Sequence, residues 1–268
     1  MDRVALLDGL VDSAIRAGLA ILDLYENGCA VETKADSSPV TAADGAAEAI
    51  ILADLARLAP GIPVVAEEEV AAGRVPEIGA RYFLVDPLDG TKEFILKRGD
   101  FTVNIALIED GVPTLGVVHA PARGRLFAGD AGAGAWTQDV SRAGDASARR
   151  PIAVRALPAG GIAAVASKSH PTPETEEYLA DYDVADRLSI GSSLKFCLVA
   201  AGEADLYPRL GPTMEWDTAA GDAVLRAAGG HVYGPDGDVL GYGKPRFFNP
   251  GFVAAGDIRP GPIGRLLK

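Results

Sequence analysis

The chain has 268 residues, with 37 Asp and Glu against 25 Lys and Arg and a formal net charge of −12 at pH 7. A chain of this length buries roughly 70–75% of its unfolded surface, so it can build one large domain or two small ones without disulfides or zinc. Nucleic-acid binding depends on Lys and Arg that neutralise phosphates, and the acidic balance therefore argues against DNA or RNA as a partner. A small charged ligand stays compatible with this charge if cations mediate its binding.

The sequence carries few signals for cross-linking or export. Cys29 and Cys197 stand in apolar surroundings without a nearby His or second Cys, which predicts reduced core thiols. No apolar stretch reaches the roughly 18–20 residues that span a bilayer, and the start of the chain does not resemble a signal peptide. We therefore expect a cytoplasmic protein. Peripheral association with the inner membrane and the choice between monomer and homodimer stay open.

Two helices are predicted at the start of the chain. Apolar residues spaced three and four apart over 3–25 indicate an amphipathic helix that ends at Gly28. After a turn at 36–39, a second helix over 41–59 begins with a Thr/Asp cap and stops at a Pro-Gly pair.

Strands follow these helices. Short apolar strands at 63–66 and 82–85 each run into acidic residues, and three or four β-like segments follow over 101–136. The polar stretch 137–150 is the best candidate for a boundary. We therefore predict an N-terminal α+β half over residues 1–140 with metal-binding acids, and a C-terminal α/β half over 150–268 with substrate-binding residues. The C-terminal half is expected to contain strands near 161–166, 187–190 and 204–207, and helices near 173–181, 191–201 and 217–229.

The segment 86–91, Asp-Pro-Leu-Asp-Gly-Thr, is the most informative part of the sequence. It places Asp86 and Asp89 at the end of an apolar strand, where the intervening Pro and the following Gly allow both carboxylates to converge. Taken alone, such a segment is also a common surface turn. A second acidic cluster that begins at Glu67 also follows a short apolar strand, and two such clusters in one half favour a site. Carboxylates of this kind hold Mg²⁺, and the Leu88 carbonyl is available as an extra ligand.

These motifs resemble those of the lithium-sensitive, magnesium-dependent phosphomonoesterases, which include inositol monophosphatase, fructose-1,6-bisphosphatase and the 3'(2'),5'-bisphosphate nucleotidases. The family's two signatures stand at 86–91 and, as Trp-Asp-Thr-Ala-Ala-Gly-Asp-Ala, at 216–223, and the resemblance covers nearly the whole chain. The version Asp-Pro-Leu-Asp-Gly-Thr-Lys-Glu-Phe at 86–94 is similar to the CysQ-type bisphosphate nucleotidases, and the stretches 38–44, 191–197, 206–213 and 249–252 agree with that branch. The implied fold is α/β in the layered α+β sense, the α-β-α-β-α sandwich of the inositol-monophosphatase-like sugar phosphatases.

The resemblance also implies roles for individual residues. Two or three Mg²⁺ ions are expected on Glu67, Asp86, Asp89 and Asp217 together with the Leu88 carbonyl. Catalysis is assigned to Asp44, Glu67 and Thr91; Thr91 would hold the attacking water with either Asp44 or Glu67, and both alternatives stay open here. Substrate binding is assigned to Glu67, Leu88, Asp89, Gly90, Thr91, His170, Ser192, Lys195, Arg209 and Asp217.

The roles in the second half compete with simpler ones. By the resemblance, Ser192, Lys195 and Arg209 would bind a 5'-phosphate, with His170 near the nucleotide; alternatively, Lys195 is a solvated helix residue and His170 a cap. Asp217 also has the sequence context of a helix N-cap. His119 and His231, which are not part of this set, lie in strand-like segments and are expected to be structural.

The resemblance implies Mg-dependent hydrolysis of the 3'-phosphate of adenosine 3',5'-bisphosphate to AMP and phosphate, with phosphoadenosine phosphosulfate as a further substrate and inhibition by lithium. An inositol-1-phosphate phosphatase is the alternative within the fold. A non-catalytic metal- or nucleotide-binding regulator would require a broken site, yet every acidic position of the motif is filled. Ala66, Met214 and Glu215 stand where the family varies, and none of these departures removes a ligand.

Overall fold

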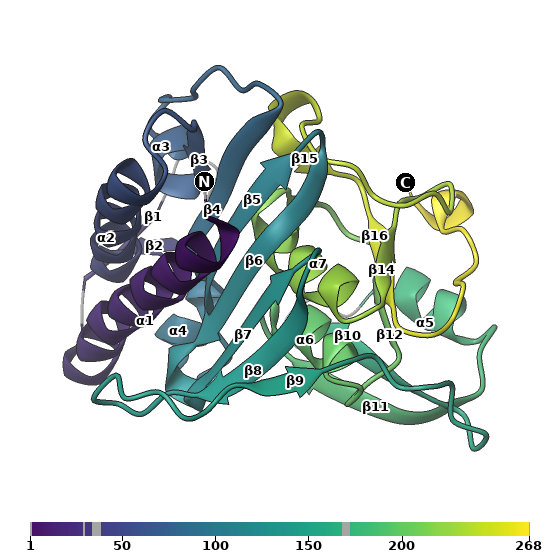
Figure 1. The fold of residues 1–268 in the computed structure, drawn as a ribbon. Coiled ribbons are helices and arrows are strands. Elements are labelled where there is room, and N and C mark those ends of the chain that lie inside the picture. Colours follow the sequence, from purple (N-terminus) through teal and green to yellow (C-terminus); the bar gives the residue numbers. More distant parts are fainter. Residues whose placement is uncertain (1, 29, 34–38, 168–171, 268) are drawn as a thin grey trace.

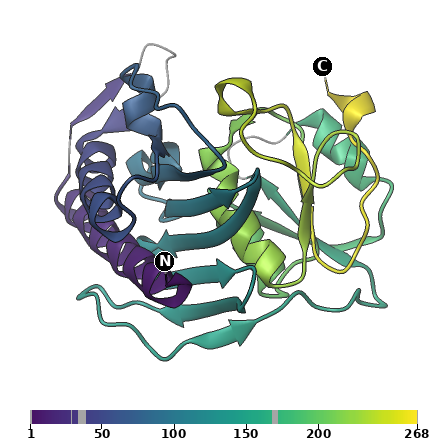
Figure 2. The same ribbon diagram turned by 45° about the horizontal axis from the view of Figure 1, so that its top comes forward.

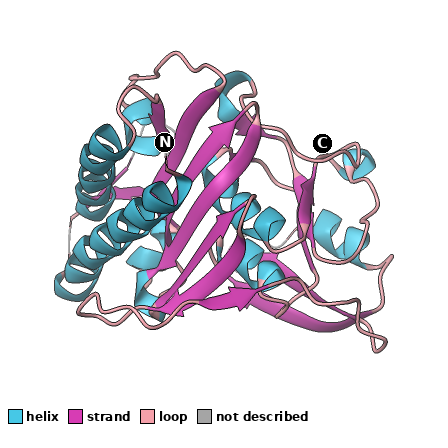
Figure 3. Cartoon of the chain, viewed as in Figure 1, coloured by secondary structure: helices cyan, strands magenta, loops and turns pink. Residues whose placement is uncertain are grey.

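The computed structural model describes residues 2–28, 30–33, 39–167 and 172–267. Its elements stack in five layers, in the order helix, sheet, helix, sheet, helix (Figures 1 and 2). Figure 3 shows the alternation by element type, with helices on both faces of the large sheet. The α-β-α-β-α sandwich expected from the sequence is confirmed. Cys29, His170 and nearly all of the predicted turn at 36–39 lie outside the described residues.

The first layer contains two helices, as predicted. α1 (Arg3–Asn27) ends at Gly28, which adopts a positive φ of 85° that suits glycine. α2 (Ala42–Leu58) begins with a capping box, in which Thr41 and Asp44 satisfy each other's backbone donors. Both helices bury their apolar sides against the large sheet.

The second layer is a seven-stranded sheet with strand order β3-β4-β5-β6-β7-β8-β9. β3 and β4 are parallel, and every other neighbouring pair is antiparallel. Parallel neighbours bring the carboxyl ends of two strands to one edge of the sheet. The strands are β3 (Val64–Ala66), β4 (Arg81–Asp89), β5 (Thr102–Glu109), β6 (Val112–Ala120), β7 (Arg125–Asp130), β8 (Gly134–Asp139) and β9 (Arg150–Ile152).

The remaining layers belong to the second half of the chain. α6 (Leu194–Ala200) and α7 (Trp216–Ala227) lie between the two sheets, and α5 (Pro173–Leu179) covers the far face of the second sheet (Figures 1 and 2). The second sheet has the order β11-β10-β12-β16-β14. Its strands are β10 (Ile162–Ser167), β11 (Val184–Ile190), β12 (Leu206–Arg209), β14 (His231–Tyr233) and β16 (Phe252–Ala255).

The last strand was missed by sequence analysis. β16 is inserted antiparallel between β12 and β14 and is buried along its length. Its four residues are too short a run to separate from other apolar segments by periodicity alone.

Short elements surround the space between the sheets. The paired strands β1 (Val31–Thr33) and β2 (Pro39–Thr41) precede α2. The paired strands β13 (Thr213–Met214) and β15 (Phe248–Asn249) lie beside the start of α7. The other short helices are α3 (Glu67–Ala71), α4 (Thr91–Ile95) and the 3₁₀ turns at Pro121–Arg123, Pro245–Phe247 and Gly264–Leu266.

The stretch between the predicted halves follows the first sheet. Residues 140–149 lead from β8 to β9, and ion pairs join Arg142 to Glu26 and Arg149 to Asp8 on α1. A single apolar cluster contains residues of the large sheet, of α6 and α7, and of the second sheet. The division into 1–140 and 150–268 stays a prediction, and the two parts share a core.

Two residues expected to be structural are placed accordingly. His119 is buried, and its Nδ1 lies 2.9 Å from the Ala14 carbonyl oxygen on α1. Cys197 is a free, buried thiol on α6, and burial raises its pKa. His231 is different, because its ring is exposed and stacks on Tyr233 at a centroid distance of 6.0 Å. Among the described residues, no helix combines the length and apolarity needed to cross a membrane.

Candidate functional site

A cavity of about 240 Å³ opens between the large sheet and the α6/α7 layer. Its walls come from the ends of β3 and β4, from α4, from α6 and from the start of α7. The predicted site residues that line it are Glu67, Asp86, Leu88, Asp89, Gly90, Thr91, Ser192, Lys195, Arg209 and Asp217. Residues that are far apart in the sequence thus meet in one pocket.

The parallel pairing of β3 with β4 explains how the two acidic clusters meet. Ala66 on β3 pairs with Val85 on β4. Glu67 and Asp86 are the residues that come directly after this pair. Both residues line the cavity at this edge of the sheet.

A β-bulge brings Asp86 and Asp89 to the same cavity. Asp86 pairs with Asn104 on β5 and Asp89 pairs with Thr102, so three steps along β4 match two steps along β5. Side chains alternate along a regular strand, and residues three apart would point to opposite faces. The extra residue in β4 removes this conflict. Asp86 Oδ1 accepts the Leu88 N–H at 3.0 Å, which stabilises the bulged conformation.

Thr91 begins α4 directly after the tight turn at Gly90. Gly90 has φ of 94°, and a Cβ there would lie 2.9 Å from the Asp100 carbonyl oxygen, so both conformation and space require glycine. The Thr91 hydroxyl lies 3.4 Å from Asp44 Oδ1 and 3.3 Å from the Leu88 carbonyl oxygen. Asp44, one of the two partners that the sequence left open, thus lies within hydrogen-bond distance of Thr91, and the choice between Asp44 and Glu67 stays a prediction.

Asp44 is held from the other side by Thr41. The Thr41 N–H and hydroxyl each donate to Asp44 Oδ2 at 2.8 Å. Asp44 is buried and stands behind the cavity wall, and it reaches the cavity through Thr91.

Asp217 lies in the first turn of α7. Its expected role as N-cap is wrong, because Glu215 occupies the N-cap position. Asp217 Oδ2 instead accepts the Met214 N–H at 2.8 Å, and this bond fixes the carboxylate against the strand that precedes the helix.

The carboxylates repel one another across the cavity. Burial raises the pKa of Asp86 well above its ordinary value, and the charges of Glu67, Asp89 and Asp217 raise it further. Burial followed by the charges of Asp89 and Glu67 raises the pKa of Asp217 in the same direction. Burial raises the pKa of Asp89 to about 6 against the opposing charge of Lys195. Concentrated negative charge on hard oxygen ligands suits a divalent cation, which would offset the repulsion.

The acids do not form a finished ligand cage. In the part of the chain that the structure describes, no three His, Cys, Asp or Glu side chains are arranged as a metal-binding cluster. The donor set fits Mg²⁺ in its chemistry, since this ion is usually held by one or two carboxylates plus water and phosphate oxygens. Of the predicted ligands, Glu67, Asp86, Asp89 and Asp217 carry the carboxylates and Leu88 carries the carbonyl.

Cationic side chains also line the cavity. Lys195 on α6 is buried, in contrast to a solvated helix residue, and its ammonium donates to the Ser192 carbonyl oxygen at 2.6 Å. Burial lowers the pKa of Lys195 to about 8, although the charge of Asp89 opposes the change. Arg209 donates to backbone oxygens of Gly211 and Pro212 at 3.4 and 3.3 Å. These side chains are therefore available to an anionic group.

Several cavity residues were not predicted to be functional. Ser193 is one of them: its hydroxyl lies 2.8 Å from the Thr102 hydroxyl and 2.6 Å from Asn104 Oδ1. These contacts join α6 to β5, so no local sequence pattern could have revealed them. The other unpredicted lining residues are Pro39, Lys92, Glu93, Gly191, Phe196, Tyr207, Thr213, Thr218 and Phe252.

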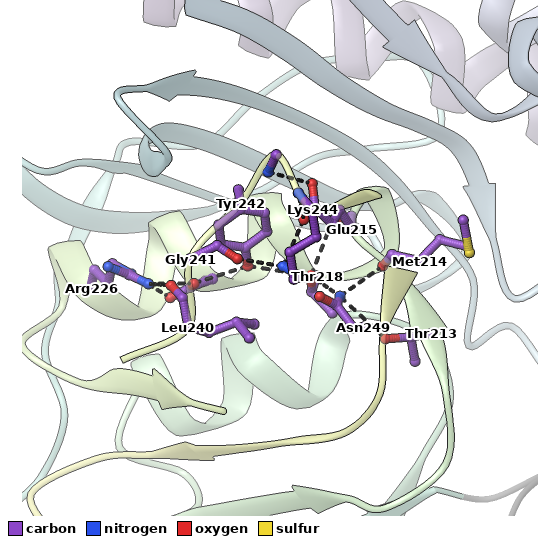
Figure 4. Close-up of polar contacts among 12 residues, drawn as sticks. Thr213, Met214, Glu215, Thr218, Arg226, Leu240, Gly241, Tyr242, Lys244 and Asn249 are labelled. Atoms are coloured by element: carbon purple, nitrogen blue, oxygen red, sulfur yellow. Dashed lines mark hydrogen bonds and ion pairs between the residues drawn. The ribbon is translucent and has the colours of Figure 1, made fainter. Parts of the chain in front are cut away.

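A buried polar network supports the start of α7 from behind (Figure 4). The Glu215 carboxylate accepts the N–H groups of Gly243 and Lys244 at 2.9 and 3.0 Å and pairs with the Lys244 ammonium at 2.6 Å. Asp222 binds the Arg226 guanidinium through two contacts of 2.7 and 2.9 Å. The loop after β14 is thereby fastened to α7.

The layered fold (Figure 1) thus encloses a cavity whose lining combines carboxylates with cationic side chains. A family model described as the inositol monophosphatase family matches residues 2–260, and the chain belongs to this family. Members of the family are metal-dependent phosphatases, and the chain is a phosphatase of this kind.

Individual relatives are similar over almost their full length. A CysQ protein of Escherichia coli strain K12, named 3'(2'),5'-bisphosphate nucleotidase, is 48% identical over 251 residues, which cover 92% of this chain and 98% of the relative. The crystal structure of CysQ from Bacteroides thetaiotaomicron has a TM-score of 0.79 and 38% identity, covering 94% of this chain and 97% of that one. The inositol monophosphatase of Anabaena has a TM-score of 0.76 and 27% identity, with 99% and 96% covered.

Proposed function

We propose that this protein hydrolyses the 3'-phosphate of adenosine 3',5'-bisphosphate, giving AMP and inorganic phosphate, with phosphoadenosine phosphosulfate as a further substrate. The observation that carries the proposal is the similarity to relatives named 3'(2'),5'-bisphosphate nucleotidase, which reaches 49% identity over 92% of the chain. The cavity supports it, since its lining combines carboxylates, which suit hard cations, with cationic side chains, which suit a phosphate.

The carboxylates of the cavity are proposed to hold, through metal ions, the phosphate that is cleaved. Glu67, Asp86, Asp89, Asp217 and the Leu88 carbonyl would bind two or three Mg²⁺ ions. When bound, such ions neutralise phosphate oxygens, acidify a coordinated water and stabilise the leaving oxygen. The raised pKa values of Asp86 and Asp217 support this assignment. Two buried carboxylates are unfavourable in their charged form without a positive charge beside them, and a bound cation would supply that charge.

Thr91 and Asp44 are proposed to position the attacking water. Thr91 accepts a hydrogen bond from the water while its own hydroxyl donates to Asp44, at 3.4 Å in this structure. The water oxygen forms a bond to phosphorus as the bond from phosphorus to the 3'-oxygen breaks. One proton of the water passes to one carboxylate, that of Asp44 by way of the Thr91 hydroxyl or that of Glu67, and the 3'-oxygen leaves with a proton from solvent.

The cationic side chains of the cavity are proposed to bind the 5'-phosphate. Lys195 and Arg209 supply positive charge, and Ser192 supplies hydrogen bonds at the turn into α6. His170 is expected near the nucleotide. The backbone of Gly90, which lines the cavity, is proposed to contact the phosphate that is cleaved.

Phosphate release measured with Mg²⁺ on adenosine 3',5'-bisphosphate, phosphoadenosine phosphosulfate and inositol 1-phosphate tests the proposal. We expect the highest kcat/KM for the adenosine bisphosphate, no turnover in chelator and inhibition by lithium. Preference for inositol 1-phosphate would assign the alternative function, for which the similarity to the Anabaena inositol monophosphatase is the supporting observation. The Asp89→Asn protein, with its fold verified by circular dichroism, is the control for contaminating phosphatases.

A further inference from the structure

The buried side chain of Asn249 makes polar contacts that the proposed reaction does not explain. Asn249 is fully buried at the end of β15 and pairs across the strands with Thr213 on β13. Its amide nitrogen lies 3.0 Å from Thr218 Oγ1, 3.2 Å from the Met214 carbonyl oxygen and 3.4 Å from Thr213 Oγ1. Figure 4 shows these contacts converging on Asn249 from β13 and α7.

The partners of Asn249 determine which end of its amide faces them. The Met214 carbonyl oxygen can only accept a hydrogen bond, so the nitrogen must point to it. The Thr218 hydroxyl donates to the Glu215 carbonyl oxygen at 3.0 Å, which leaves its oxygen to accept from Asn249. An amide has two N–H groups, and the two shortest contacts use both of them.

This bridge spans the segment that carries Asp217. Thr213 and Thr218 line the cavity on either side of Asp217 in the sequence, and Asn249 contacts both hydroxyls. The Met214 residue that Asn249 holds by its carbonyl also donates its N–H to Asp217 Oδ2 at 2.8 Å. Asn249 therefore acts on the Asp217 carboxylate through one intervening residue.

We propose that Asn249 is a positioning residue for the metal site, which sets the orientation of the Asp217 carboxylate by holding Met214 and Thr218. The inference rests on the proposed assignment of Asp217 as a metal ligand. Side chains that orient a ligand in this way commonly change metal affinity or activity by 10–100-fold when they are removed. A purely structural Asn would affect stability alone.

Calorimetric titration with Mg²⁺, first alone and then with inorganic phosphate, measures this role without turnover. We expect the Asn249→Ala protein to bind Mg²⁺ about tenfold more weakly. The Asn249→Asp protein should bind it more weakly still, because an oxygen then faces the Met214 carbonyl oxygen. Asn249→Ser is the smaller change if either protein fails to fold.

Thr137→Val is the matched control. The buried Thr137 hydroxyl on β8 donates to the Leu126 carbonyl oxygen at 2.9 Å, and neither residue lines the cavity. Its loss should lower the melting temperature without changing Mg²⁺ affinity. Equal Mg²⁺ affinity in the Asn249→Ala protein and the wild type would overturn the inference. If the wild type fails to hydrolyse adenosine 3',5'-bisphosphate but Asn249→Ala still weakens Mg²⁺ binding, the proposed function fails and the inference stands.

Discussion

Thr91 and Asp44 are 47 residues apart in the sequence, and the Thr91 hydroxyl lies 3.4 Å from Asp44 Oδ1. The first turn of α4 and the first turn of α2 thus meet beside the cavity. The capping box that starts α2 also fixes the Asp44 carboxylate, so helix capping and the proposed water activation use the same side chain.

We expect Thr91→Val and Asp44→Asn each to lower kcat by about 100-fold, because each breaks the same chain from water to carboxylate. The double variant should lose little more than either single one, since the two residues act as a unit. Thr91→Ser keeps the hydroxyl and should retain most of the activity. Independent, additive losses in the steady-state rates would show that the pair does not work together.

Gly90→Ala should destabilise the protein by ~1–3 kcal/mol, because alanine would adopt a positive φ and place its Cβ 2.9 Å from the Asp100 carbonyl oxygen. Urea unfolding followed by fluorescence measures the change. Gly45→Ala on α2 is the control, since a Cβ there meets nothing within 4 Å and alanine favours helices. A stability equal to that of the wild type would mean that the turn tolerates a side chain.

The pH profile should report Lys195. Burial lowers its pKa to about 8, so the side chain is charged below that pH and neutral above it. We expect kcat/KM to fall as the pH rises through about 8, because a neutral amine no longer attracts the substrate phosphate. Arginine stays charged, and Lys195→Arg should remove this alkaline limb. An unchanged limb in that variant assigns it to another group.

Acid should destabilise the protein through His119. Burial lowers the pKa of His119 from 6.5 to about 4, so the folded state resists protonation that the unfolded chain accepts. The contribution of the neutral, buried His119 to the free energy of unfolding is fully present above pH 6.5. It is lost as the pH falls through about 4, and the free energy of unfolding then decreases by roughly 3 kcal/mol.

Guanidinium unfolding of the wild type and of His119→Gln between pH 4 and 7 measures this contribution. The difference in unfolding free energy between the two proteins should change with pH by that amount. The exposed His231 provides the control variant, His231→Gln, for which a smaller pH dependence is expected. If the unfolding free energies of both variants depend on pH in the same way, His119 is not the group that causes the acid destabilisation.

Local sequence patterns were sufficient for most of the elements. The apolar spacing over 3–25 predicts α1, and the Thr41 cap with the Pro-Gly stop predicts α2, because these signals act between residues close in the chain. Asp86 and Asp89 of the first signature, together with Glu67, are predicted in the same way, because carboxylates that follow apolar strands indicate a magnesium site. Asp217 of the second signature is predicted as a ligand only through the resemblance to the family, to which the chain belongs.

Only the tertiary structure decided how those acids meet. The bulge between Asp86 and Asp89 depends on the register with β5, which no stretch of β4 alone specifies. The hydrogen bond from Thr91 to Asp44 and the bridge of Asn249 to Thr218 join segments that are brought together by the packed layers. Such contacts depend on long-range pairing and burial, whereas local propensity acts over a few residues. The sequence by itself therefore determined the chemistry available at the site, and the folded layers determined its geometry.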